Sequence, residues 1–165
     1  MSEVIKEEDL FTPIISDGES LSIEVINNFN ALLIDVDLKP ELELFHISLF
    51  NRTLRRTMFE ELRMVYIGLW YLALTHSFPQ NVDDFFETFL MQYLDKFPTS
   101  QRIIIQNKIH DYKDMILRAG TKDFNHISQH LLSFVRIKDK DMKAEVLRLS
   151  LALRTHYNFI FQHLV

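Results

Sequence analysis

An uncharged apolar stretch near the middle of the chain constrains the fold more than any other feature of the sequence. Residues 64–74 contain no Asp, Glu, Lys or Arg, and they lie within a longer segment, 52–77, where Met58, Leu62 and Leu69 recur at helical spacing. A helix that is apolar nearly all round must be enclosed by other elements. The apolar stretch is also much shorter than the roughly 20 residues that a membrane-spanning helix needs. The sequence therefore predicts a buried central helix and no transmembrane segment.

Four further helices are expected after this one. They fall at about 81–97, 99–120, 121–136 and 139–163, where apolar residues follow the helical period and stop signals stand near the ends. The chain has only three Gly and no Cys in 165 residues, which leaves little material for tight β-turns and excludes thiol catalysis and Cys-based zinc sites. We therefore predict an all-α fold, a compact bundle of about five to seven helices around the central one.

The segment 20–50 leaves two interpretations open. Ile26 and Phe29 belong to a helical stripe, whereas Leu21, Ile23 and Val25 alternate with polar neighbours as in a half-buried strand. The alternative fold is accordingly α+β, with a short N-terminal β-hairpin before a five-helix domain.

The first residues of the chain have a different character. Residues 1–19 combine an acidic cluster with Pro13 and the turn signal Asp17-Gly18, so we expect a flexible acidic arm there and a single helical domain over 20–165. The acidic start has no basic region followed by a long apolar run, as a signal peptide would. This pattern favours a cytoplasmic location.

Charge is distributed unevenly along the chain. Residues 1–45 carry eleven acidic and two basic side chains, and the remainder carries sixteen basic and twelve acidic ones. Arg52, Arg55 and Arg56 form a basic patch that could hold a phosphate. The net charge of −5 instead favours an ordinary solvated helix surface, so we expect no nucleic-acid partner.

Two carboxylate–histidine pairs at helical spacing suggest metal ligands. Glu43 precedes His46 by three residues, as Asp123 precedes His126, and a Glu-x-x-His spacing supplies ligands in di-iron helical bundles. His126 and His130, however, project away from the apolar stripe of their predicted helix, so the candidate is a surface metal site at these two histidines. No motif for phosphate binding or nucleophilic catalysis is present. We expect no cofactor and no enzymatic activity, with a metal-dependent helical enzyme as the remotest alternative.

The aromatic content is high, with fourteen Phe, five Tyr and one Trp. Most of these rings follow the helical period and are expected in the core. Large rings can also leave an apolar pocket between helices that suits a small apolar ligand. The candidates for lining such a pocket are Trp70, Phe86, Phe89 and Tyr93.

The end of the chain carries a candidate interaction surface. Phe159 and Phe161 lie about 200° apart on a helix, so both cannot face one core. The expected exposed apolar strip comprises Phe159, Phe161, Leu164 and Val165. The sequence thus favours a non-enzymatic protein–protein interaction or regulatory module that self-associates, most simply as a homodimer, or binds another protein. The alternative is a small-molecule sensor with an apolar interhelical pocket.

Overall fold

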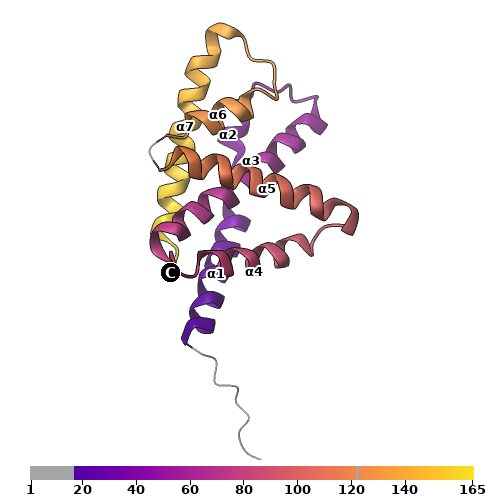
Figure 1. Cartoon of the computed structure of the whole chain (residues 1–165). Coiled ribbons are helices and arrows are strands. Elements are labelled where there is room, and N and C mark those ends of the chain that lie inside the picture. Colours follow the sequence, from indigo (N-terminus) through magenta and orange to yellow (C-terminus); the bar gives the residue numbers. More distant parts are fainter. Residues whose placement is uncertain (1–16, 122) are drawn as a thin grey trace, which may run out of the picture.

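Residues 17–121 and 123–165 are described by a computed structural model, and within these ranges the chain forms seven helices and no strand (Figure 1). The all-α prediction is confirmed. The hairpin alternative is wrong, because residues 17–35 form one helix whose buried residues are the helical stripe Val25, Ile26, Phe29 and Leu33. The helices are α1 (Asp17–Asp35), α2 (Lys39–Glu43), α3 (Arg52–Ser77), α4 (Val82–Leu94), α5 (Thr99–Ala119), α6 (Asn125–Leu132) and α7 (Asp139–Gln162).

Helix α3 is the predicted central helix. Its first turn is capped by Asn51, whose Oδ1 accepts a hydrogen bond from the Leu54 amide at 3.2 Å. Every residue from Met64 to Leu74 is buried. Gly68 faces α5 so closely that a Cβ there would lie 2.8 Å from Cδ1 of Ile116. The apolar stretch therefore forms the core around which α1, α4, α5 and α7 pack.

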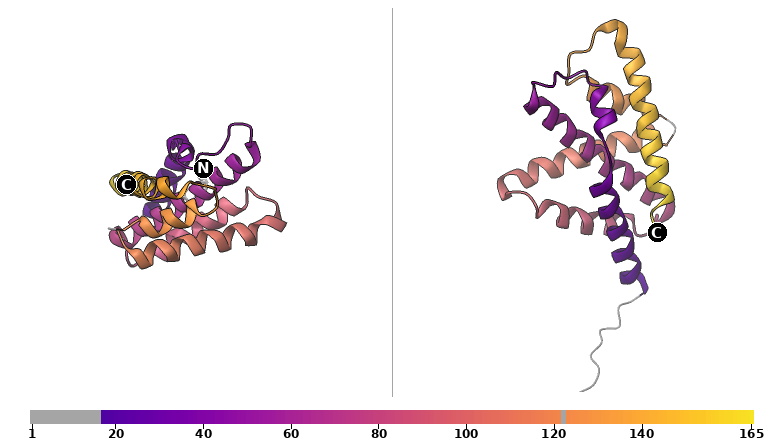
Figure 2. Two further views of the ribbon diagram at one scale, coloured as in Figure 1. Left: turned by 90° about the horizontal axis from the view of Figure 1, so that it is seen from above. Right: turned by 180° about the vertical axis from the view of Figure 1, so that it is seen from behind.

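The other helices take distinct places around α3. Figures 1 and 2 show α4 and α5 as a hairpin that projects to one side of the molecule, while α7 runs along the opposite edge. The end of the chain returns to α1, where Asn28 Nδ2 donates to the Leu164 carbonyl at 3.5 Å. None of the helices among the described residues is long and apolar enough to cross a membrane.

Three of the four ring candidates for an apolar pocket, Trp70, Phe86 and Phe89, are packed in the core between α1, α3 and α4. Trp70 stacks on Phe29 with ring centroids 4.3 Å apart, and Phe89 meets both rings edge-on at 5.0 Å. Phe86 packs against Trp70, and Tyr93 against Phe89. Because Trp70, Phe86 and Phe89 are at most 1% exposed, they are packing residues. The open apolar pocket lies elsewhere, as described below.

Two segment boundaries differ from the sequence prediction. The helix expected over 121–136 is only Asn125–Leu132, and Phe134 is 48% exposed because the helix has ended before it. Helix α1 begins at Asp17, within the last positions assigned to the acidic arm. Residues 1–16 of that arm lie outside the described residues.

Candidate functional site

The solvent-facing side of α7 carries an apolar strip. Leu147 is 57% exposed, Leu151 52% and Phe161 44%, although all three belong to a helix that also contributes buried residues to the core. Arg154 and Asn158 are exposed as well. The five positions 147, 151, 154, 158 and 161 are separated by alternating intervals of four and three residues. This alternation keeps all five side chains on one face, as in the seam of two packed helices. The face therefore has the side-chain spacing found where two helices pack.

The predicted C-terminal interaction residues divide into three groups. Phe161 lies on the α7 strip and Val165 is exposed just beyond the helix end. Phe159 is half-exposed but lies about 120° round the helix from Leu147, on the side of α1. Leu164 is wrongly placed in an exposed strip, because it is 4% exposed and packed in the core where the chain end returns to α1.

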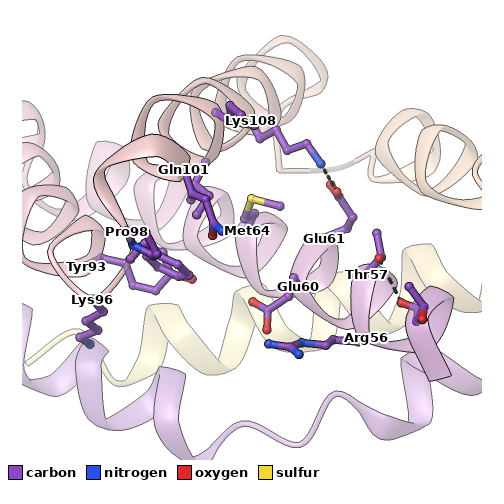
Figure 3. A pocket seen from close by; sticks show the side chains of 14 residues that line it. Arg56, Thr57, Glu60, Glu61, Met64, Tyr93, Lys96, Pro98, Gln101 and Lys108 are labelled. Atoms are coloured by element: carbon purple, nitrogen blue, oxygen red, sulfur yellow. Dashed lines mark hydrogen bonds and ion pairs between the residues drawn. The ribbon is translucent and has the colours of Figure 1, made fainter.

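A cleft of about 570 Å³ opens between the first half of α3 and the α4–α5 corner (Figure 3). Met64 and Tyr93 are buried residues of its lining, and Pro98 and Gln101 come from the corner and the start of α5. Charges of both signs surround it, including Arg56, Glu60, Lys96 and Lys108. Figure 3 shows Arg56 and Glu60 side by side and Lys108 directed at Glu61. The lining therefore carries three basic and two acidic side chains, with Glu61 as the second acid, so neither charge dominates.

Glu61 is the buried charge of this cleft, with 4% exposure. Lys108 Nζ pairs with its Oε1, and the Tyr112 hydroxyl donates to its Oε2. Burial, the hydrogen bond to Glu61 and the nearby carboxylates all raise the pKa of Tyr112. Both carboxylate oxygens therefore have partners, so the arrangement joins α3 to α5 and leaves no free group for chemistry.

Removing the Tyr112 hydroxyl tests this connection. Tyr112→Phe leaves Glu61 Oε2 buried without its donor, so we expect a loss of about 1–3 kcal/mol in the free energy of unfolding. The matched control is Tyr157→Phe, because no described group bonds to the Tyr157 hydroxyl and its removal should change stability by less than about 0.5 kcal/mol. Urea unfolding followed by circular dichroism measures both, and equal effects would contradict a specific Glu61–Tyr112 bond.

A second pocket of about 420 Å³ lies between the end of α1, α3 and α7. Its apolar lining comes from Leu32, Val36 and Phe159, and its polar groups are those of Asp35, Asp37, Tyr66, Thr155 and His156. Tyr66 is 2% exposed, and its hydroxyl has no hydrogen-bond partner among the described residues. Burial raises the pKa of Tyr66 to about 12, so the hydroxyl stays neutral at physiological pH. The volume of the pocket, about 420 Å³, lies within the usual range for small-molecule sites.

Two carboxylate–imidazole pairs join the α2 segment to α7, and one of them lies in the wall of this pocket through His156. Glu41 Oε1 lies 2.9 Å from His156 Nε2, and Glu145 Oε1 lies 3.4 Å from His46 Nε2. Both glutamates are buried, and the second oxygen of each has no hydrogen-bond partner. The His156 ring also meets Tyr66 edge-on at 5.6 Å. The two polar rings of the pocket are therefore held in fixed orientations.

The basic patch is divided by the fold. Arg55 is 18% exposed and bound to Glu43 Oε1 at 2.5 Å and to the Ile47 carbonyl at 3.2 Å. This bond to Arg55 lowers the pKa of Glu43. Arg56 faces the cleft, and Arg52 is exposed. The three arginines thus do not form one anion site.

The histidine pair considered for metal binding lies on α6. His126 is exposed, whereas His130 is partly buried with its ring against Tyr112 and Phe134. The carboxylate–imidazole pairs above use His46 and His156 instead. Within 17–121 and 123–165, no cluster of three or more His, Cys, Asp or Glu side chains has an arrangement that could hold a metal ion.

The sequence prediction missed Leu147 and Leu151 on α7 and the whole polar lining of the second pocket. The two leucines were detectable, since they fall outside the inward stripe of Val146, Leu149 and Leu153 yet keep helical spacing with Phe161. No local pattern links Glu41 with His156, because 115 positions separate them.

No protein-family model matches the chain, and neither a curated protein nor a solved structure matches it significantly.

Proposed function

We propose that the protein is a non-enzymatic interaction module that forms a homodimer through the exposed face of α7. The observation that carries the proposal is the strip of Leu147, Leu151 and Phe161, which has the seam spacing of packed helices and no covering element among the described residues. Apolar side chains gathered on one helix face favour association because contact removes them from water. Figures 1 and 2 place α7 at the edge of the molecule, where a second helix can reach it.

The strip complements itself when two α7 helices run antiparallel. With the two-fold axis at position 156, Leu151 of one copy lies opposite Phe161 of the other, and Arg154 lies opposite Asn158. Apolar side chains then meet apolar ones at 151 and 161, and the two polar positions 154 and 158 meet each other. Such matching of a surface with its own copy is what a two-fold interface requires, so a second copy of this chain is the occupant we propose.

The size of the contact sets the expected strength. Helix α7 has 24 residues, which makes it about 36 Å long, and only one of its faces is available. An interface limited to one helix from each copy lies at the low end of specific interfaces. We therefore expect a dimer that dissociates on dilution.

A charge on the strip tests the proposal. Leu151→Glu places two unpaired carboxylates in the dimer interface, one per copy. We expect the free energy of dimerisation to become about 3 kcal/mol less favourable, which makes the dissociation constant about a hundredfold larger. The fold should not change, since Leu151 is 52% exposed. The matched control is Ile103→Glu, a residue on α5 with 58% exposure. Sedimentation equilibrium over a concentration series gives both constants. A wild-type protein that stays monomeric, or a Leu151→Glu variant that dimerises normally, would refute the interface.

The absence of native cysteine allows a test of the register. In the antiparallel arrangement, the doubly substituted chain Arg154→Cys/Asn158→Cys brings introduced thiols together across the axis, so mild oxidation should trap a covalent dimer. The control pair Leu147→Cys/Leu151→Cys should not cross-link, because each thiol lies opposite a position near the end of α7 in the other copy. Non-reducing electrophoresis distinguishes the two outcomes.

A second function is favoured by the pocket between α1, α3 and α7. We propose that this pocket receives a small ligand with an apolar body, so that the module also acts as a sensor. Support comes from the volume of about 420 Å³, the apolar side chains of Leu32, Val36 and Phe159, and the unbonded hydroxyl of Tyr66. Isothermal titration of the full chain with tryptamine, an amine on an apolar aromatic body, tests this function.

A further inference from the structure

The mouth of the α1–α3–α7 pocket is negatively charged. Asp35 and Asp37 both line it, and none of the residues described around the pocket is Lys or Arg. Helix α1 ends at Asp35, so the negative end of its dipole lies at the same place. Asp37 Oδ1 accepts from the Lys39 amide at 3.0 Å, which leaves its other carboxylate oxygen for a ligand. An anion would be repelled here, and a cation would be attracted.

Asp35 also stands where it is electrostatically unfavourable for the fold. A carboxylate in the last turn of a helix opposes the helix dipole, and this turn contains no basic residue. Its side chain is exposed, so its charge is not required by packing. A bound cation would relieve the repulsion between the carboxylate and the terminal carbonyl groups.

The interior of the pocket has a different character from its mouth. Leu32, Val36 and Phe159 offer apolar contact, and the Tyr66 hydroxyl offers one hydrogen bond from a residue that is 2% exposed. A hydroxyl that no described protein group bonds is a polar group that a ligand can satisfy. His156, the one basic side chain in the lining, is already held by Glu41 through Nε2, and Glu41 is a further negative group beside the pocket.

We propose that this pocket binds an organic amine, with its ammonium group at Asp35 and Asp37 and its apolar body against Leu32, Val36 and Phe159. A polar atom of the ligand bonds the Tyr66 hydroxyl. The Phe159 ring, which also packs against His163 with centroids 4.2 Å apart, gives apolar contact in the same lining. The inference rests on the second function proposed above and is independent of the α7 dimer.

Three ligands that share one aromatic ring system distinguish the contribution of charge to the binding affinity from that of apolar contact. Tryptamine, tryptophol and indole-3-propionate carry an amine, an alcohol and a carboxylate on the same indole. Isothermal titration of the full chain should show saturable one-to-one binding of tryptamine, at least tenfold weaker binding of tryptophol, and none of indole-3-propionate. Equal affinity for the amine and the alcohol would overturn the assignment of a cation site. Absence of saturable tryptamine binding at millimolar concentrations would overturn the proposal altogether.

Substitutions locate the binding. The double variant Asp35→Asn/Asp37→Asn should weaken tryptamine at least tenfold, and Tyr66→Phe should weaken it at least threefold while preserving ring packing. The matched control is Asp84→Asn/Asp111→Asn, which removes two exposed carboxylates on α4 and α5 and should change the affinity less than twofold. A loss in the control as large as that in the first pair would mean general charge attraction and no site.

The two proposed functions fail separately in these experiments. Leu151→Glu should abolish the dimer and leave tryptamine affinity unchanged, because Leu151 does not line the pocket. If the protein is monomeric yet binds tryptamine with the expected variant pattern, the dimer is wrong and the amine site stands. If tryptamine does not bind a protein that dimerises as expected, the amine site alone is wrong.

Discussion

Raising the pH from about 9 to about 12 is expected to unfold the protein in one cooperative step that coincides with the ionisation of its tyrosines. All five tyrosines are buried, and burial raises the pKa of each. The pKa of Tyr66 and that of Tyr71 rise to about 12, and the hydrogen bond from the Tyr71 hydroxyl to Asp83, 2.8 Å long, adds to the effect of burial. The folded chain therefore resists the ionisation that the unfolded chain undergoes near pH 10.

The sign of the effect follows from proton binding. Above pH 10 the unfolded chain releases phenolic protons that the folded chain retains, so the free energy of unfolding decreases as the pH rises. The stabilisation is complete below pH 10 and is lost as the pH passes toward 12. Absorbance at 295 nm, which reports tyrosinate, should rise together with the loss of helical circular dichroism. Five tyrosines that titrate near pH 10 while the helices persist would contradict their burial in the described packing.

A variant separates the tyrosine contribution from general alkaline denaturation. Tyr71→Phe removes one group with a raised pKa, so the decrease of stability with pH should become shallower between pH 10 and 12. An alkaline transition of unchanged steepness would show that Tyr71 does not contribute to it.

The helices were largely predictable because their signals are local. The period of the apolar residues indicated α3, α4, α5 and α7, and Gly120 directly follows α5 as expected. Segment 20–50 was ambiguous because Leu21, Ile23 and Val25 alternate while Ile26 and Phe29 keep the helical period. Tertiary packing decided the outcome, since Phe29 gains the Trp70 ring as a partner only when α1 is helical.

The candidate sites were much less predictable because they depend on how helices cross. The sequence identified Phe161 as an exposed residue, but the seam spacing with Leu147 and Leu151 has meaning only once the opposite face of α7 is known to be buried. The pocket brings Asp35 and Tyr66 together from two helices, and neither residue is unusual in its own segment. Conversely, the conspicuous pair Asp123 and His126 is exposed, and no group of three or more potential ligands forms among the described residues.

Replacing Gly68 with Val is expected to destabilise the protein by at least about 3 kcal/mol, through overpacking between α3 and α5. A Cβ at this position would lie 2.8 Å from Cδ1 of Ile116 and 3.5 Å from the Lys113 backbone nitrogen. The branched side chain of Val extends beyond Cβ toward the backbone of α5, which cannot rotate away as a side-chain methyl group can. Gly68→Ala is the matched control. Its single methyl group displaces only the end of Ile116, and the gain in helix propensity, about 1 kcal/mol, offsets that strain.

Urea unfolding of the two variants decides whether α3 and α5 are in contact at this position. If Gly68→Val unfolds at the wild-type midpoint, the helices are not in contact there. If Gly68→Ala lowers the unfolding midpoint as much as Gly68→Val does, the Ile116 side chain cannot move aside and is held as rigidly as the backbone. The expected order, with Ala near the wild type and Val far below it, would show that the helix packing tolerates one methyl group and no more. The uncharged stretch around Gly68 would then select α5 as its packing partner in two ways, through the close approach of the two backbones and through burial of apolar side chains.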